Sequence, residues 1–383
     1  MIDAMSRDLV DPATVGVNAA RLDALIRRVR TEVDIGRLPS AQLALARRGR
    51  LVAFETVGDA GVSVAEPRYL LQSAGRPYVA SAAWKLIGDG RLDVSEPVAD
   101  IIDEFATHGK DSITVEHVMT HTAGIPFAPL GYPKMADRGR RLEAFAKWRL
   151  DEPPGQTFQF HLTSAGWVIA EIVERRSGMP LPEFLRREIA EPLGLGAALG
   201  VSRDDQKAGV APMRCTDGDG SDVDPWGPWY LNNPDIVAAG EPSHAVVASA
   251  ADIGLHYQAL LAALAGDDRL WSPEVIADAV RARVTAVPVG EQIYGGSQLR
   301  TSMGLFVTVR GPDAGSWMPP NASPEAFGNG GAAYQLAFAD PATGLSFALL
   351  SNGYPQSGYD YTPGGVALLR DVGNLAAGCS LPD

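Results

Sequence analysis

The sequence has few of the features that hold a chain together by means other than a packed core. Only two cysteines, Cys215 and Cys379, occur in 383 residues. This number is too small for a disulfide framework and favours two free thiols in a reducing compartment, a single bridge between them being the alternative. No apolar run approaches the roughly 20 residues of a membrane helix, and the N-terminus lacks the basic and apolar segments of a secretory signal. These absences predict a cytoplasmic protein.

Basic charge and metal or nucleotide motifs are also missing. The formal net charge is −13, which argues against nucleic acids and anionic membranes as partners, because both need a basic surface. No HExxH motif and no clustered histidines or cysteines indicate a metal site. No dinucleotide fingerprint or phosphate-binding loop occurs either. We therefore expect no cofactor and no metal, and a small-molecule substrate or ligand as the partner; the oligomeric state stays open.

The sequence does contain clear signals for helices and strands. Apolar residues at helical spacing predict an amphipathic helix over 17–29 with Asn18 as its cap, a buried helix over 77–87, and further helices over 165–176 and 365–377. Strands are predicted within 42–54, around a turn at Arg48-Gly49, and in a hairpin of 334–339 and 345–350. Residues 217–233 form a long polar and aromatic loop, which is typical of an active-site wall.

These elements predict an α/β (α+β) protein with a single domain over 1–383. Because strands lie at both ends of the chain with helices between them, one mixed, mainly antiparallel sheet should be completed by distant segments. We expect an α/β lobe of about residues 15–75 and 285–383, and a helical lobe of about 76–284.

Four motifs in order carry a resemblance to a known family. Ser73-Ala-Gly-Arg76 opens the buried helix, and Ile113 to Pro126 follows as a histidine- and threonine-rich stretch. The third motif spans Pro154 to Phe160 and the fourth Phe327 to Pro341. In this arrangement the chain resembles the β-lactamase-like serine hydrolases, which include class C β-lactamases, D-aminopeptidases and β-lactamase-like esterases. The resemblance covers about residues 15–375 and implies their fold, a central mainly antiparallel sheet flanked by helices.

The resemblance also implies a mechanism that this chain departs from. The family uses a serine nucleophile, a lysine base one helical turn later, a Tyr-x-Asn motif, and a strand motif with His or Lys. Ser73 retains the nucleophile position, but the lysine is replaced by Arg76, whose guanidinium stays protonated. Phe160-His161-Leu162 replaces Tyr-x-Asn.

The strand motif departs as well. Asn329 takes the His or Lys position of that motif. Gly331 still permits close approach to a substrate, so backbone N–H groups of Ser73 and Ala332 remain candidates for an oxyanion hole.

Two histidines are candidates for the missing base. His161 lies inside the degenerate second motif, and His244 lies in a segment whose counterparts line the family's site, with Glu241 beside it. A neutral imidazole is the natural general base near pH 7, whereas a polar wall residue or structural hydrogen-bonder is the alternative that the sequence favours for each histidine. His117 and His121 match scaffold positions.

The surroundings of these residues are also expected from the sequence. Buried beside the site, Arg76 needs either an anionic ligand or structural partners such as carbonyls. Aromatic residues in loops are expected to rim the cleft, either as a hydrophobic pocket or through ordinary packing. They are Tyr132, Trp226, Trp229 and Tyr230.

Three functional hypotheses follow. In the first, an enzyme with a repurposed site acts on a specialised small metabolite by cyclisation, isomerisation, lyase chemistry or acyl transfer. In the second, an esterase- or amidase-type hydrolase still uses Ser73 with a substitute base. In the third, a non-catalytic protein binds a ligand in the inherited pocket, and Ser73 is only a helix-start serine.

Overall fold

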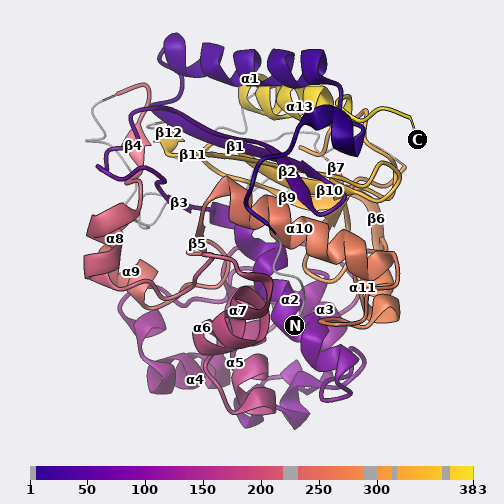
Figure 1. Ribbon diagram of the computed structural model, residues 1–383. Coiled ribbons are helices and arrows are strands. Elements are labelled where there is room, and N and C mark those ends of the chain that lie inside the picture. The colour runs from indigo at the N-terminus through magenta and orange to yellow at the C-terminus, as the bar shows by residue number, and fades with distance from the viewer. Residues whose placement is uncertain (1–5, 219–231, 289–299, 313–316, 356–362, 383) are drawn as a thin grey trace.

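The central feature of the protein is an antiparallel sheet to which both ends of the chain contribute (Figure 1). The computed structural model describes residues 6–218, 232–288, 300–312, 317–355 and 363–382. Strand β1 (Ser40–Arg47) pairs with β2 (Arg50–Gly58) on one side and with the C-terminal strand β11 (Leu345–Ser351) on the other, which confirms the predicted mainly antiparallel sheet. Within the described residues the strand order is β2 (Arg50–Gly58), β1 (Ser40–Arg47), β11 (Leu345–Ser351), β10 (Gln335–Asp340), β9 (Phe327–Gly331), β8 (Thr308–Val309), β7 (Arg300–Met303) and β6 (Val284–Pro288).

The two faces of the sheet carry side chains of different size. Leu43, Phe338 and Phe347 point to the face covered by helices α1 (Ala19–Asp34) and α13 (Pro363–Ala377). Their neighbours in sequence, such as Ala44 and Ala348, point to the opposite face, because side chains alternate along a strand. These small side chains let helix α10 (Ala250–Leu264) lie directly against the strands, as Figure 1 shows.

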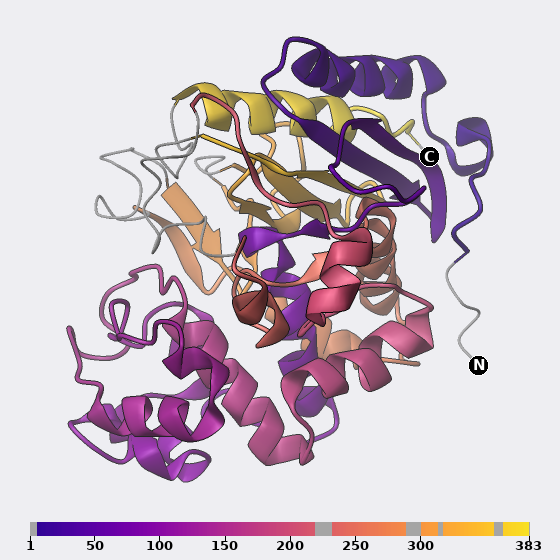
Figure 2. The same cartoon turned by 90° about the vertical axis from the view of Figure 1, so that its left-hand side faces the viewer.

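The remaining helices lie on the α10 side of the sheet and extend away from it. In Figure 2 the purple and magenta segments of about residues 100–180 are packed at a distance from the strands. Helix α10 itself packs on the sheet. These helices are α2 (Arg76–Gly88), α3 (Val115–Met119), α4 (Arg138–Lys147), α5 (Ser164–Ser177), α6 (Leu181–Phe184), α7 (Glu191–Leu193), α8 (Arg203–Gly209), α9 (Pro234–Ala238) and α11 (Pro273–Ala279).

Several local signals in the sequence act as predicted. Asn18 caps α1 by accepting a hydrogen bond from Arg21 N at 3.1 Å. Arg48 and Gly49 both adopt positive φ and connect β1 to β2. Cys215 and Cys379 are free in the structure. Among the described residues, no helix is both long and apolar enough to cross a bilayer.

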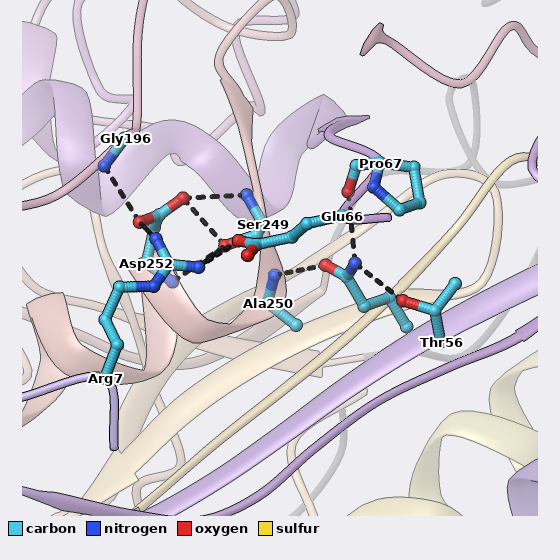
Figure 3. Close-up of polar contacts among 9 residues, drawn as sticks. Arg7, Thr56, Glu66, Pro67, Gly196, Ser249, Ala250 and Asp252 are labelled. Atoms are coloured by element: carbon cyan, nitrogen blue, oxygen red, sulfur yellow. Dashed lines mark hydrogen bonds and ion pairs between the residues drawn. The ribbon is translucent and has the colours of Figure 1, made fainter. Parts of the chain in front are cut away.

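A buried polar network fixes the start of α10 (Figure 3). The Asp252 carboxylate accepts hydrogen bonds from Gly196 N at 2.8 Å, Ser249 N at 3.0 Å and Ser249 Oγ at 2.7 Å. Ser249 in turn accepts from Asp252 N at 3.2 Å, which completes a capping box. Arg7 pairs with Asp252 and with Glu66, so the N-terminal segment is tied to this helix.

Candidate active site

Ser73 lies on a sharp turn between a short strand and the buried helix α2. Strand β3 (Tyr69–Leu70) leads into a 3₁₀ turn over Gln72–Gly75, and α2 begins directly afterwards. Gln72 has a φ of +48°, an uncommon conformation for a side-chain-bearing residue, and such strain is typical of functional turns. Ser73 is 8% exposed, and the N-cap of α2 is Gly75 rather than Ser73. The turn therefore presents its hydroxyl without using it in the helix start.

Strand β9 holds this turn from one side. Asn329 Nδ2 donates to the Ser73 carbonyl at 2.6 Å, and Thr308 Oγ1 donates to Asn329 Oδ1 at 2.6 Å. A Cβ on Gly331 would lie 2.8 Å from Leu71 O and 3.0 Å from Ala74 N, so only glycine permits this approach. Asn329, at the position of the motif's His or Lys, is 2% exposed and tethers the Ser73 turn to β9.

The segment that carries His244 runs beside the Ser73 turn. Strand β5 (Val247–Ala248) pairs antiparallel with β3, matching Leu70 with Val247, and Leu71 N donates to Val246 O at 2.9 Å. This pairing ends where the 3₁₀ turn begins, and His244 lies two residues before Val246 in the same segment. A Cβ on Gly75 would contact the Val246 side chain at 2.8 Å, so the start of α2 also lies against this segment.

Glu241 and His244 form a buried pair within that segment. His244 Nδ1 lies 2.9 Å from Glu241 Oε2, and Ser243 N donates to Glu241 Oε1 at 3.2 Å. Burial lowers the pKa of His244 below its ordinary value, Glu241 partly opposes this shift, and the nearby Arg76 charge adds to it. The ring is therefore neutral near pH 7. Its Nδ1–H donates to the carboxylate, so Nε2 is the basic nitrogen.

Arg76 is buried among aromatic rings and carbonyl groups. Its guanidinium lies 4.4 Å from the centre of the Phe160 ring and 5.2 Å from that of Phe306. Nη2 donates to Leu162 O at 2.6 Å and Nη1 to His161 O at 3.3 Å. These contacts, with an exposure of 1%, support the structural reading of Arg76 over direct contact with an anionic ligand.

His161 is held by the backbone through both ring nitrogens. Nδ1 lies 2.6 Å from Gln159 O, and Nε2 accepts from Ile125 N at 3.2 Å. Burial is the main cause that lowers the pKa of His161 to about 4. Proton transfer would require these bonds to break, so the geometry does not support the predicted catalytic role for His161.

The other predicted site residues lie at different depths. Phe160 is 3% exposed and stacks on His121 with ring centres 4.6 Å apart, so it forms the floor beneath Arg76. Leu162 and Ala332 remain partly exposed next to the Ser73 turn and β9. The predicted rim residues Trp226, Trp229 and Tyr230 lie outside the described residues.

Two residues of the site were not found from the sequence. Phe306 adopts a positive φ of 61° and packs against both Arg76 and the His121 ring, and no motif indicates it. His121, expected to be scaffold, lies 3.4 Å from Arg76 Nη1 and accepts from His161 N at 3.1 Å. The motif order alone could have placed His121 near Arg76. In the part of the chain that is described, no group of three or more potential metal ligands occurs.

Comparison with known proteins finds relatives of this chain. The beta-lactamase family model matches residues 25–369, which is most of the chain. Esterase EstB of Burkholderia gladioli is 27% identical over 249 residues, covering 56% of this chain and 62% of the esterase. A putative D-alanyl-D-alanine carboxypeptidase of Escherichia coli K12 is 27% identical over 211 residues, 48% of each protein. The matches thus span about half to three fifths of these relatives.

Solved structures resemble the whole chain. A penicillin-binding protein homologue from Caulobacter crescentus superposes with a TM-score of 0.77 and 27% identity, covering 96% of this chain and 99% of the homologue. A family VIII carboxylesterase has the same TM-score at 21% identity, covering 94% and 99%, which shows the fold alone. The resemblance seen in the sequence motifs is confirmed.

Proposed function

Because the chain belongs to the beta-lactamase family, we propose that it is a serine hydrolase that cleaves a small ester or amide through an acyl-enzyme on Ser73. The observation that carries this proposal is the Glu241–His244 pair at 2.9 Å, in the segment that leads into β5, the antiparallel partner of the strand before the Ser73 turn. The pair takes over the task for which Arg76 is unsuited, since a guanidinium does not accept a proton near neutral pH.

The proposed reaction follows the logic of a Ser–His–carboxylate triad. Ser73 Oγ attacks the carbonyl carbon while His244 Nε2 takes the hydroxyl proton, and Glu241 stabilises the imidazolium through Nδ1–H. The backbone N–H groups of Ser73 and Ala332 bind the oxyanion. The imidazolium then protonates the leaving group, and water cleaves the acyl-enzyme by the reverse proton path. Arg76 keeps a fixed positive charge below the site, which favours the negatively charged intermediate.

The relatives support hydrolysis over a repurposed non-hydrolytic reaction. Those compared above are named as an esterase and a putative carboxypeptidase, both hydrolases. Acyl transfer to an acceptor other than water uses the same acyl-enzyme and remains compatible with the proposal. Cyclisation, isomerisation or lyase chemistry on a specialised metabolite would need His244 but not Ser73 as a nucleophile.

A fluorophosphonate probe with intact-protein and peptide mass spectrometry tests the proposal. We expect a single adduct in the wild type, located on Ser73, and no adduct in Ser73→Ala. His244→Gln should slow labelling by about 10³-fold, within the range for loss of a general base, and Glu241→Gln by about tenfold.

The matched control for this experiment is His108→Gln, which replaces an exposed histidine outside the site and should label like the wild type. A folded wild type that takes up no probe would contradict the hydrolase and favour the non-hydrolytic or binding hypotheses. Equal labelling rates in wild type and His244→Gln would contradict the assignment of the base.

A further inference from the structure

A second concave site lies on the helical part of the protein, apart from the Ser73 turn. The hollow has a volume of about 320 Å³, within the size range of small-ligand pockets. The segment after Ile125 forms one wall, and α4 with the residues that follow it forms the other. It shares no lining residue with the candidate active site.

The rim of this hollow is positively charged. Lys134, Lys147 and Arg149 line it and are exposed, whereas Asp151 is the one acidic residue among the lining residues. Within the described residues none of these three cations forms an ion pair, although surface arginines elsewhere, such as Arg138 with Glu171, do so. In a chain with a net charge of −13, such a group of unpaired cations is a local exception.

The charge of Arg149 also affects the pKa values of neighbouring groups. Desolvation lowers the pKa of both His108 and Lys110, and the Arg149 charge lowers each of them further. Lys110 itself is buried and donates to Trp148 O at 2.9 Å, so its charge is held behind the hollow. Lys110 does not line the hollow, but it adds a buried cation next to the lining residue Trp148.

Apolar groups form the rest of the surface. Phe127 is 51% exposed and is among the few large hydrophobic side chains on the surface of the described residues. Trp148 is 2% exposed, and its Nε1 donates to Pro129 O at 3.1 Å, so the polar atom of the indole is already satisfied. With Ala128 and Ala144, these rings give an apolar lining below the cations.

We propose that this hollow binds an amphipathic carboxylate, with its hydrophobic part against Phe127 and its carboxylate among Lys134, Lys147 and Arg149. Charge complementarity selects an anion, and a single ring system or short acyl chain fits the volume. The exposed phenyl ring of Phe127 would contribute to binding, because the hydrophobic part of the ligand would cover it and remove it from water. The proposal does not depend on the reaction at Ser73.

Isothermal titration with 1-naphthoate tests this site, with 1-naphthalenemethanol as the neutral analogue of the same shape. We expect saturable naphthoate binding with a Kd below about 1 mM, and binding of the alcohol at least about tenfold weaker. The double variant Lys147→Gln/Arg149→Gln, whose side chains are exposed and whose fold should be intact, is expected to lose tenfold or more in affinity. Phe127→Ser should weaken the binding of both naphthoate and the alcohol.

Two controls make the result specific to this hollow. Arg27→Gln removes an exposed cation on α1 and should leave naphthoate binding unchanged. Wild type whose Ser73 has been blocked by a fluorophosphonate should bind naphthoate as before. The proposal is overturned if no saturable binding is found, if the double variant binds like the wild type, or if blocking Ser73 abolishes binding.

Discussion

The hydrogen bonds of the His161 and His244 rings distinguish a structural histidine from the proposed base. His161 bonds to the backbone through both nitrogens, to Gln159 O and from Ile125 N, so its ring connects two loops. His244 instead has a carboxylate on Nδ1, which fixes the tautomer with Nε2 as the basic nitrogen. The sequence placed both residues near the site but could not rank them, because the partner of each ring nitrogen comes from folded geometry.

Another buried histidine, His256, makes the stability of the protein depend on pH. Within the described residues neither of its ring nitrogens has a hydrogen-bond partner, and it is surrounded by the rings of Tyr78, Tyr257 and Trp271. Burial lowers its pKa from 6.5 to about 3. Below pH 6.5 the unfolded chain therefore binds a proton that the folded chain does not, and stability falls until the pH reaches about 3.

We expect His256→Leu to reduce this loss. Between pH 7.5 and pH 5, the lowered pKa of His256 should cost the wild type about 2 kcal/mol of its free energy of unfolding. The variant should not lose this part. Urea unfolding at both pH values measures the difference. If wild type and variant lose the same free energy of unfolding between pH 7.5 and pH 5, His256 is not held neutral in the folded protein.

At the scale of elements, three segments position Ser73. Strand β3 pairs with β5 and brings the His244 segment alongside, while β9 holds the turn through Asn329 and the close approach at Gly331. The sequence predicted the helix after Ser73 and the strand motif at β9. It did not predict the β3–β5 pair, because two-residue strands have too short a pattern to be recognised.

Helix α10 follows β5 directly, so its start is an anchor for the His244 segment. Asp252→Ala removes the acceptor for Gly196 N, Ser249 N and Ser249 Oγ and should lower the free energy of unfolding by about 3 kcal/mol (Figure 3). Arg7→Gln should cost about 1 kcal/mol or less, because Arg7 is 34% exposed. Urea unfolding followed by circular dichroism measures both. A loss below 1 kcal/mol for Asp252→Ala would show that the network is not an anchor.

At the scale of the whole molecule, the motifs predicted the fold correctly, because their order and spacing reflect one sheet shared by distant segments. The division of the chain into two lobes stays a prediction, since an apolar helix such as α10 has the same pattern whether it packs on helices or on a sheet. The sequence left open whether Arg76 meets a ligand or carbonyls, and it did not indicate the partner of Asn329. Their partners, the carbonyls of Leu162 and Ser73, become neighbours only in the folded chain.

The pH dependence of Ser73 labelling by a fluorophosphonate tests most directly whether His244 is the base. We expect the wild-type labelling rate to rise with pH and to level off with a midpoint below 6.5, because burial lowers the pKa of His244. In Glu241→Gln the midpoint should fall further, since Glu241 raises that pKa, and in His244→Gln this rise should be absent. A wild-type midpoint above about 8, or the same profile in wild type and His244→Gln, would contradict the account.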